Sequence, residues 1–475
     1  MTEPAQIPDQ AAREAAATTF DRNVVVIAGA GTGKTTLLVN RLLYLLMRRT
    51  DPLDLSRIVA LTFTNKAATE MKLRLRERLR SLVNVEGRDN PAAGSGTVSI
   101  ADLRMRYGWT TDEIVARADA ALRDVEKAQI GTLHSFAAHL LRLYPIEAGV
   151  TPTFQTDEDG SRFEEHFTSE WELWLDGELG AAGSDHGRWR ILLDTFSLDE
   201  LRELAYSLHS DLIDLNGLMQ QVAETGLNPG LRDWFSIRKA QAERLLTRYD
   251  RPKRRKIELM LAAVAELFAL LLAEGLGAVR SFPRESQELL AKDLGAAPTG
   301  WEEDDYEAVE SLQRIAKRLL RVDHELLQNL LALLAPFVQS VRKSFLDSGW
   351  LTFDGLVGKA RTLLRDHPPI REQLKRDYRA LLVDEFQDTD PVQYEIVLYL
   401  AERPGTQAGS WRETELESGK LFIVGDPKQS IYAFRRADIE AFDHVVDRLE
   451  GSGALRCELA TNFRSHAQVL DLVNG

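Results

Sequence analysis

Six short apolar runs along the chain each end in a polar loop, and this pattern constrains the fold more than any other feature. The runs are rich in Val, Ile and Leu, and the loops carry Gly, Thr, Asp or Asn. Runs and loops together occupy residues 23–31, 57–65, 128–136, 379–388, 421–426 and 455–463. Because helical patterns follow most of them, the alternation predicts an α/β fold with a parallel sheet covered on both faces. Ligands of such sheets bind beyond the carboxyl ends of the strands, where these loops are expected to lie.

The chain between about residues 144 and 376 has a different pattern. It is nearly all helical, and apolar residues recur on one helix face over residues 312–330. Pro336 is expected to kink or break that helix. So much helix within an α/β core predicts a large all-helical inserted domain. The expected domains are a first core segment over 1–145, the insertion over 146–375 and a second core segment over 376–475.

Length and charge narrow the class of protein. With 475 residues, the chain exceeds a single hydrophobic core, and roughly two to four domains are expected. Taken alone, the net charge of −14 at pH 7 argues against nucleic-acid binding. Binding depends on local patches rather than on total charge, however, and basic residues cluster at 72–80 and 248–256. Each cluster is either a solvated face or a binding surface.

Cysteine content and hydropathy indicate a compartment. Cys457 is the single cysteine, which excludes a disulfide framework and a Cys-based zinc site and fits a reducing compartment. No signal-peptide pattern opens the sequence. The apolar segment over residues 259–273 is too short to span a membrane and indicates a buried amphipathic helix. We therefore expect no membrane partner.

The sequence AGAGTGKTT follows the first predicted strand and opens an apolar helix, which is the setting of a P-loop. Ala28 replaces the first glycine of the pattern, but the remaining glycines still let backbone N–H groups approach phosphate oxygens. Lys34 is expected to neutralise the β- and γ-phosphates of a nucleotide, and Thr35 to hold Mg²⁺. The predicted nucleotide contacts in this loop are Ala28, Gly29, Ala30, Gly31, Thr32, Gly33, Lys34, Thr35 and Thr36.

The sequence LLVDEFQD supplies the groups that a P-loop itself lacks. Asp384 ends a predicted strand and can reach Mg²⁺, usually through water. Glu385 follows it and can accept a proton from an attacking water. The alternative is an acidic strand end that caps a helix, a role that suits Asp388 and Asp390 better.

The sequence VGDPKQSIYAFRRAD, residues 424–438, combines aromatic and basic side chains directly after a predicted strand. Tyr432 and Phe434 lie beside Arg435 and Arg436. A plain surface loop does not require this combination, so we expect the loop to contact a ligand that is both flat and anionic.

Six motifs in this chain resemble those of the superfamily 1 UvrD/Rep-type DNA helicases in order and approximate spacing. They are AGAGTGKT, TFTNKAATEM, GTLHSF, VDEFQDTD, GDPKQSIYAFRRAD and TNFRS, and the resemblance covers residues 10–466. LLRLYPIEAGVTPTF, LTFDGLVGKARTLL and the large helical insertion are similar to the AddA/RecB branch. The resemblance implies a RecA-like core that uses ATP and Mg²⁺ for 3′–5′ DNA helicase or translocase activity. It also implies bacterial recombination or double-strand-break repair in the cytoplasm.

The resemblance assigns roles around the nucleotide. Gln10 matches the glutamine that reads adenine, and Phe463 matches the aromatic residue that stacks on it. Arg464 matches the arginine that stabilises charge on the γ-phosphate, and Gln429 matches a sensor of hydrolysis. With Lys34 and Glu385, these two complete the expected catalytic set. Related helicases sometimes carry an adenine-contacting arginine where this chain has Thr36, which leaves contact on that side open.

The resemblance also implies DNA contacts. Phe63 and Phe434 match aromatic residues on which DNA bases stack, a contact worth about 1–3 kcal/mol. The implied partners are single-stranded DNA, a single–double-strand junction and a second helicase–nuclease subunit. The full set of expected DNA contacts is Thr62, Phe63, Thr64, Asn65, Thr132, His134, Tyr432, Phe434 and Arg435.

Related helicases continue past the TNFRS motif into a second RecA-like domain, and some continue into a nuclease domain. This chain ends at Gly475. We therefore expect the chain alone to bind nucleotide, to hydrolyse it poorly and not to unwind DNA. The alternative is a truncated, non-catalytic module that binds DNA or a partner protein. A repair ATPase of the ABC type is a third interpretation, but its signature motif is absent ahead of the acidic strand.

Overall fold

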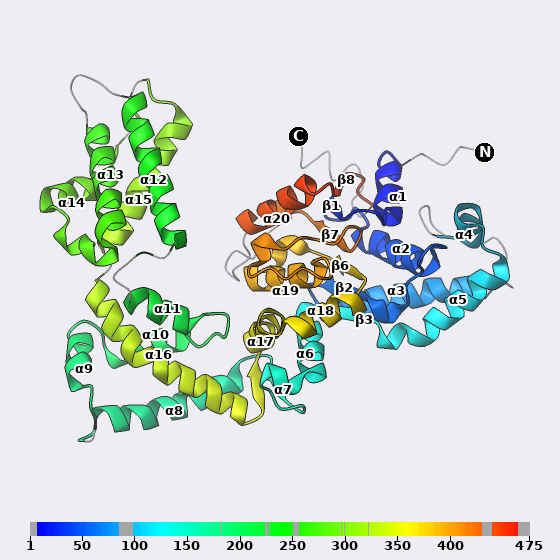
Figure 1. The fold of residues 1–475 in the computed structure, drawn as a ribbon, viewed down its shortest axis with the longest axis horizontal. Helices are drawn as coiled ribbons and strands as arrows, with labels where there is room; N and C mark the ends of the chain where they lie inside the picture. The colour runs from blue at the N-terminus through cyan, green and yellow to red at the C-terminus, as the bar shows by residue number, and fades with distance from the viewer. Residues whose placement is uncertain are drawn as a thin grey trace. The chain divides into compact units, whose positions relative to one another are not determined.

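A computed structural model describes residues 7–463 of the chain. Within that span the structure omits residues 85–97, 182, 224–226, 228, 250–255, 296, 299, 322 and 430–438. The described residues divide into two compact units, one of residues 1–159 with 349–475 and one of residues 160–348 (Figure 1).

A six-stranded parallel sheet forms the centre of the first unit, among the residues that the structure describes. Its order is β3-β2-β6-β7-β1-β8. The strands are β1 (Val24–Ala28), β2 (Ile58–Thr62), β3 (Gln129–Thr132), β6 (Ala380–Val383), β7 (Leu421–Gly425) and β8 (Leu455–Leu459). Each falls in one of the six predicted runs. The α/β fold with a parallel sheet is therefore confirmed.

Both faces of the sheet are buried, which explains why the strands are continuous apolar runs. Val26 of β1 belongs to a core built with the helices α1, α2, α3 and α5. Its neighbour Val25 is also buried and belongs to the opposite face, where α17 packs on α6 and α19. The helices of this unit are α1 (Gln10–Thr18), α2 (Lys34–Met47), α3 (Asn65–Val83), α4 (Ile100–Tyr107), α5 (Thr111–Asp124), α6 (Leu133–Leu143), α7 (Pro145–Ala148), α17 (Phe353–Asp366), α18 (Pro368–Asp377), α19 (Pro391–Ala401) and α20 (Ile439–Gly451).

Two further strands lie where the chain leaves and re-enters the first unit. They are β4 (Gln155–Asp157) and β5 (Trp350–Thr352), and they pair in parallel. No pattern in the sequence predicts these two strands, because three residues are too few to show strand periodicity.

The second unit is all helical in its described residues. Its helices are α8 (Ser161–Leu179), α9 (His186–Leu193), α10 (Leu198–Ser207), α11 (Leu215–Ala223), α12 (Pro229–Arg248), α13 (Lys256–Glu274), α14 (Arg284–Ala291), α15 (Glu303–Leu320) and α16 (His324–Asp347). This compact unit begins and ends inside the predicted insertion of residues 146–375, because α17 and α18 pack with α6 and α19 of the first unit.

Of the two outcomes expected at Pro336, a kink or a break, the structure excludes the break. α16 continues through Pro336, and the apolar pattern over residues 312–330 is divided earlier, between α15 and α16. Asp323 caps α16, since its side chain accepts a hydrogen bond from the backbone N–H of Leu326. The ring of Phe337 packs on two tryptophans of α8, and this packing offsets the backbone hydrogen bond that proline cannot donate.

The described helices include none with the length and apolar character needed to cross a membrane. The most apolar, α13, buries Leu267 and Phe268 in a core shared with α12, α14 and α15.

Candidate nucleotide and DNA site

The loop between β1 and α2 directs backbone N–H groups toward the start of a helix. Gly31 and Gly33 have φ angles of 76° and 83°, in the left-handed region that a side chain disfavours. The N–H and the hydroxyl of Thr32 both donate to the carbonyl of Gly29, at 3.4 and 2.8 Å. α2 begins at Lys34, so its unpaired N–H groups and the positive end of its dipole lie at the loop. Such a helix start favours a phosphate group.

The predicted lysine and the predicted general base are in contact. Lys34 Nζ donates to Glu385 Oε2 at 2.6 Å, and the two side chains are 10% and 31% exposed. Glu385 has φ 50° and ψ 46°, a left-handed conformation that costs a residue with a Cβ about 1–3 kcal/mol. Backbone strain therefore coincides with the ion pair. A phosphate that binds Lys34 would release the Glu385 carboxylate.

Asp384 is buried at the end of β6. One of its carboxylate oxygens, Oδ1, accepts a hydrogen bond from the backbone N–H of Glu385 at 3.0 Å. Burial raises the pKa of Asp384 to about 7, and the neighbouring charge of Glu385 contributes in the same direction. A bound cation would favour the charged form instead.

The donor set fits Mg²⁺, which proteins usually hold through one or two carboxylates together with substrate phosphates and water. Thr35 and Asp384 supply a hydroxyl and a buried carboxylate, each adjacent in sequence to one member of the Lys34–Glu385 pair. No group of three or more acidic, His or Cys side chains with metal-site geometry occurs among the described residues. An Mg²⁺ ion at this place would therefore depend on phosphate oxygens for much of its coordination.

Gln387 links this acidic pair to β7, and the sequence analysis did not single it out. Its Nε2 donates to Glu385 Oε2 at 2.9 Å, and its Oε1 accepts from the N–H of Asp426 at 3.0 Å. A Cβ at Gly425 would lie 2.8 Å from Gln387 Oε1, so a larger residue there would displace the Gln387 amide. In the sequence, Gln387 is only a polar residue within VDEFQD. Its burial, with 1% of the residue exposed, is seen only in the structure.

Asp426 and Gln429 lie against the P-loop. Gln429 Nε2 donates to Asp426 Oδ2 at 2.5 Å. A Cβ built on Gly29 would lie 3.7 Å from Asp426 Oδ2 and 3.9 Å from Gln429 Nε2. The structure therefore places the predicted sensor Gln429 beside the predicted phosphate loop, connected through Asp426 and Gln387 to Glu385.

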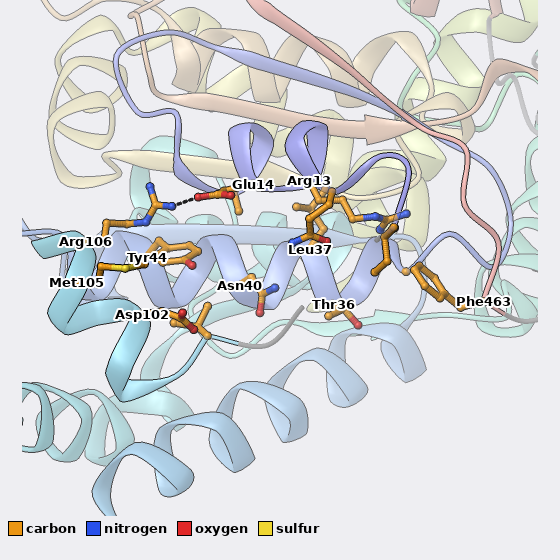
Figure 2. A pocket seen from close by; sticks show the side chains of 15 residues that line it. Arg13, Glu14, Thr36, Leu37, Asn40, Tyr44, Asp102, Met105, Arg106 and Phe463 are labelled. Atoms are coloured by element: carbon orange, nitrogen blue, oxygen red, sulfur yellow. Dashed lines mark hydrogen bonds and ion pairs between the residues drawn. The ribbon is translucent and has the colours of Figure 1, made fainter. Parts of the chain in front are cut away.

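A pocket of about 480 Å³ adjoins the P-loop, between α1, α2, α4 and the segment after β8 (Figure 2). Gln10 and Phe463, the predicted adenine contacts, both line it, and so does Thr36. Gln10 Oε1 is buried and has no hydrogen-bond partner among the described residues. Arg74 of α3 donates to Thr36 Oγ1 at 3.5 Å. The pocket also contains Arg13, which the sequence analysis missed.

Four of the predicted DNA contacts, Thr62, Phe63, Thr132 and His134, lie together at the carboxyl ends of β2 and β3, beside that of β6. A small cavity of about 30 Å³ is lined there by Leu61, Thr62, Phe63, Thr132, Leu133, His134, Val383, Asp384, Thr389 and Gln393. Asp384 thus adjoins the Lys34–Glu385 pair in sequence and also lines the cavity that contains Phe63. This arrangement connects the two predicted sites through one strand end.

The threonines at this edge also shape the backbone. Thr64 and Thr132 cap α3 and α6, accepting from the N–H groups of Ala67 and Ser135 at 3.1 and 3.2 Å. A hydroxyl that accepts in this way keeps its proton for another acceptor, such as a phosphate. Thr62 Oγ1 already donates to the carbonyl of Thr64 at 3.0 Å. Asn65 is exposed at the first position of α3.

His134 stacks on Phe353 with ring centroids 3.6 Å apart and an angle of 14° between the planes. Burial lowers the pKa of His134 to about 4, although the charge of Asp354 opposes the shift. The imidazole is therefore neutral at pH 7 and can contact a phosphate only as a hydrogen-bond donor, not as a cation.

Four predicted site residues lie outside the described residues: Tyr432, Phe434, Arg435 and Arg464. Their expected roles stay predictions.

Comparisons with known proteins agree with the motifs. The family described as UvrD/REP helicase N-terminal domain matches residues 9–449. Among similar proteins are the AddA polypeptides of the ATP-dependent helicase/nuclease of Bacillus mycoides, at 26% identity, and of Bacillus anthracis, at 27%. Each alignment covers 94% of this chain and 37% of the relative. The corresponding polypeptide of Geobacillus thermodenitrificans is 26% identical, over 95% of this chain and 38% of the relative. The chain thus spans less than two fifths of the length of these relatives.

Proposed function

The chain belongs to the UvrD/REP helicase family, and from this premise we propose that it forms the ATP- and DNA-binding motor portion of an ATP-dependent DNA helicase or translocase. The observation that carries the proposal is the position of Asp384 and Glu385. Glu385 contacts the P-loop lysine, whereas Asp384 lines the cavity that contains Phe63, Thr132 and His134. Two consecutive residues at one strand end thereby adjoin both ligands.

In the proposed reaction, Lys34 exchanges its Glu385 partner for the β- and γ-phosphate oxygens of ATP. The released Glu385 carboxylate accepts a proton from the water that attacks the γ-phosphate. Mg²⁺ held near Thr35 and Asp384 would neutralise charge on the phosphates. Gln387 holds Glu385 in place and relates its position, through Asp426, to Gln429.

On the DNA side, a base of single-stranded DNA stacks on Phe63. Thr64, Thr132 and Asn65 donate hydrogen bonds to phosphates, while His134 contributes a neutral donor. We extend the proposal to 3′–5′ movement, a single–double-strand junction as substrate and repair or recombination in the bacterial cytoplasm. The relatives are named as subunits of an ATP-dependent helicase/nuclease, and this supports a partner that is another polypeptide of such a complex.

The test compares nucleotide binding, single-stranded DNA binding and DNA-stimulated hydrolysis in the purified 475-residue chain. Lys34→Ala should abolish nucleotide binding. Glu385→Gln should retain binding and lower any DNA-stimulated hydrolysis about 10²–10⁴-fold, as expected for loss of a general base. Hydrolysis that survives Glu385→Gln would contradict the assignment. DNA binding without nucleotide binding in the unmodified chain would favour the non-catalytic module.

A further inference from the structure

Asp9 and Arg13 form a two-pronged ion pair at the start of α1. Arg13 Nε donates to Asp9 Oδ1 at 2.8 Å, and Arg13 Nη2 donates to Asp9 Oδ2 at 2.9 Å. The side chains are only 14% and 8% exposed. An aspartate directly before a helix usually caps it, but the Asp9 side chain makes no capping bond to α1. The Asp9 carboxylate therefore does not act as the cap of α1.

Each member of the pair binds another segment of the nucleotide site. Arg13 Nη1 donates to the carbonyl of Thr32 in the P-loop at 2.6 Å. Asp9 Oδ2 accepts from the N–H groups of Ala460 and Thr461 at 2.9 and 3.0 Å, and Arg13 Nη2 reaches the carbonyl of Thr461 at 3.4 Å. The pair thereby connects the P-loop to the segment after β8.

The guanidinium also covers one face of an aromatic ring. Arg13 lies over Phe463, 5.0 Å from the ring centroid, which is cation–π geometry. Phe463 stays 56% exposed, and its N–H donates to the carbonyl of Gly31 at 2.8 Å. Figure 2 shows Arg13, Thr36 and Phe463 toward one end of the pocket, with Met105 and Arg106 at the other.

We propose that Asp9 and Arg13 are positioning residues for the nucleotide base, because they hold the Phe463 ring at a fixed place relative to the P-loop. A purine stacks on the face of the ring that Arg13 leaves open, while the phosphates bind the adjacent P-loop. Arg13 of α1 thus places a positive charge beside the base, whereas Thr36 in the same pocket carries no charge. The inference rests on the proposed function, in which this pocket binds ATP.

The alternative role is structural, in which the pair only attaches α1 to the P-loop. The two roles differ in which part of the nucleotide they affect. If the pair positions Phe463, its loss changes the affinity for a ligand that has a base. The affinity for a ligand that consists only of phosphates then stays unchanged. Bracing of the P-loop changes both affinities equally.

The experiment measures dissociation constants of the 475-residue chain for ATP and for inorganic tripolyphosphate, both with Mg²⁺, by titration calorimetry. Arg13→Ala should weaken ATP binding about five- to tenfold, the range of a partly desolvated cation–π contact, and change tripolyphosphate binding less than about twofold. Asp9→Asn should act in the same direction. Arg13→Lys should restore part of the loss, because lysine keeps a charge near the ring but lacks the two-pronged bond.

Two further variants serve as controls. Arg48→Ala removes an arginine that also pairs with an aspartate and lies 5.3 Å from a ring centroid, that of Phe20, but lies outside the pocket. It should leave both affinities unchanged. Phe463→Leu should weaken ATP binding, and adding Arg13→Ala should cause little further loss, since both changes remove the same contact.

Equal losses for ATP and tripolyphosphate would overturn the positioning role, as would unchanged ATP binding in a folded Arg13→Ala protein. Should Arg13→Ala fail to fold by circular dichroism, the Asp9→Asn and Arg13→Lys measurements decide between the two roles in the same way. Unmodified protein that binds neither ligand would overturn the proposed function, and this inference with it.

Discussion

Two groups of charged residues form similar ion pairs, one at each end of the sheet strands. The two groups differ in how far they are exposed to solvent. At the amino ends, Glu402 accepts hydrogen bonds from Arg371 and Lys375, and all three side chains are at most 3% exposed. At the carboxyl ends, Lys34 and Glu385 form a pair that is partly exposed and includes a strained backbone. The first group is closed to solvent, whereas the second lies beside a pocket.

The difference lies in the number of partners that each group has. Lys375 also donates to the carbonyls of Arg403 and Thr406, and Glu402 also accepts from the N–H of Ala408. Such a network holds a loop in one arrangement through several bonds at once. Lys34, by contrast, has one carboxylate partner in the described structure, which a phosphate can replace. The number of further hydrogen-bond partners thus distinguishes an ion pair that stabilises the fold from one that can exchange its partner during a reaction.

Breaking the closed group should have the largest effect. Glu402→Gln leaves Arg371 buried without a carboxylate partner and leaves Lys375 with Glu372 alone. The free energy of unfolding should therefore fall by about 3–5 kcal/mol. Urea denaturation followed by circular dichroism measures the loss. Glu450→Gln is the matched control, because its pair with Arg456 is exposed and should contribute less than about 1 kcal/mol. Losses of similar size in the two variants would contradict the comparison.

The stability of the carboxyl edge should depend on pH through His134. The pKa of His134 is about 4 in the folded protein against 6.5 in the unfolded chain, so its contribution is complete above pH 6.5 and is lost as pH falls toward 4. The loss should be on the order of 2 kcal/mol. Asp384 and Asp388, with pKa values raised to about 7 and 6 by burial and by Glu385, act in the opposite direction over this range.

The informative quantity is therefore the difference between the unmodified chain and His134→Gln, measured by urea denaturation at several pH values. That difference should shrink from pH 7 to pH 4. A difference independent of pH would show that His134 is not buried in its neutral form.

The smallest effect should come from backbone strain at Glu385. Glu385→Ala and Glu385→Gly both remove the ion pair to Lys34, but only glycine adopts the left-handed conformation without strain. The glycine variant should be more stable by about 1 kcal/mol in thermal or urea unfolding. Equal stabilities would mean that the backbone relaxes once the carboxylate is gone, and that the ion pair itself imposes the strain.

Local patterns predicted the strands and the P-loop, since each is encoded within about ten neighbouring residues. VVVIAGAGTGKTT contains a strand, a turn and a helix start in one stretch, and the structure has them there. The six runs also predicted one parallel sheet, although not the order of its strands. Strand order depends on pairings between distant segments, which a local pattern does not contain.

The residues that the sequence analysis missed act through partners far along the chain. Asp9 matches a helix cap by position, and only the structure shows its bonds to Ala460 and Thr461. Gln387 is an ordinary polar residue until β7 places Asp426 beside it. α16 does not break at Pro336 for a similar reason, because Phe337 packs against another helix far along the chain.

The bonds of Asp9 to the segment after β8 have a consequence for synthesis. Asp9 and Thr461 are 452 residues apart in sequence, so this side of the pocket cannot form until Thr461 has left the ribosome. At about 5–20 residues per second, roughly 20 to 90 seconds separate the two residues during translation. The P-loop therefore emerges early, but a complete base pocket forms late. Nucleotide binding is then a property of the assembled fold, not of the early nascent chain.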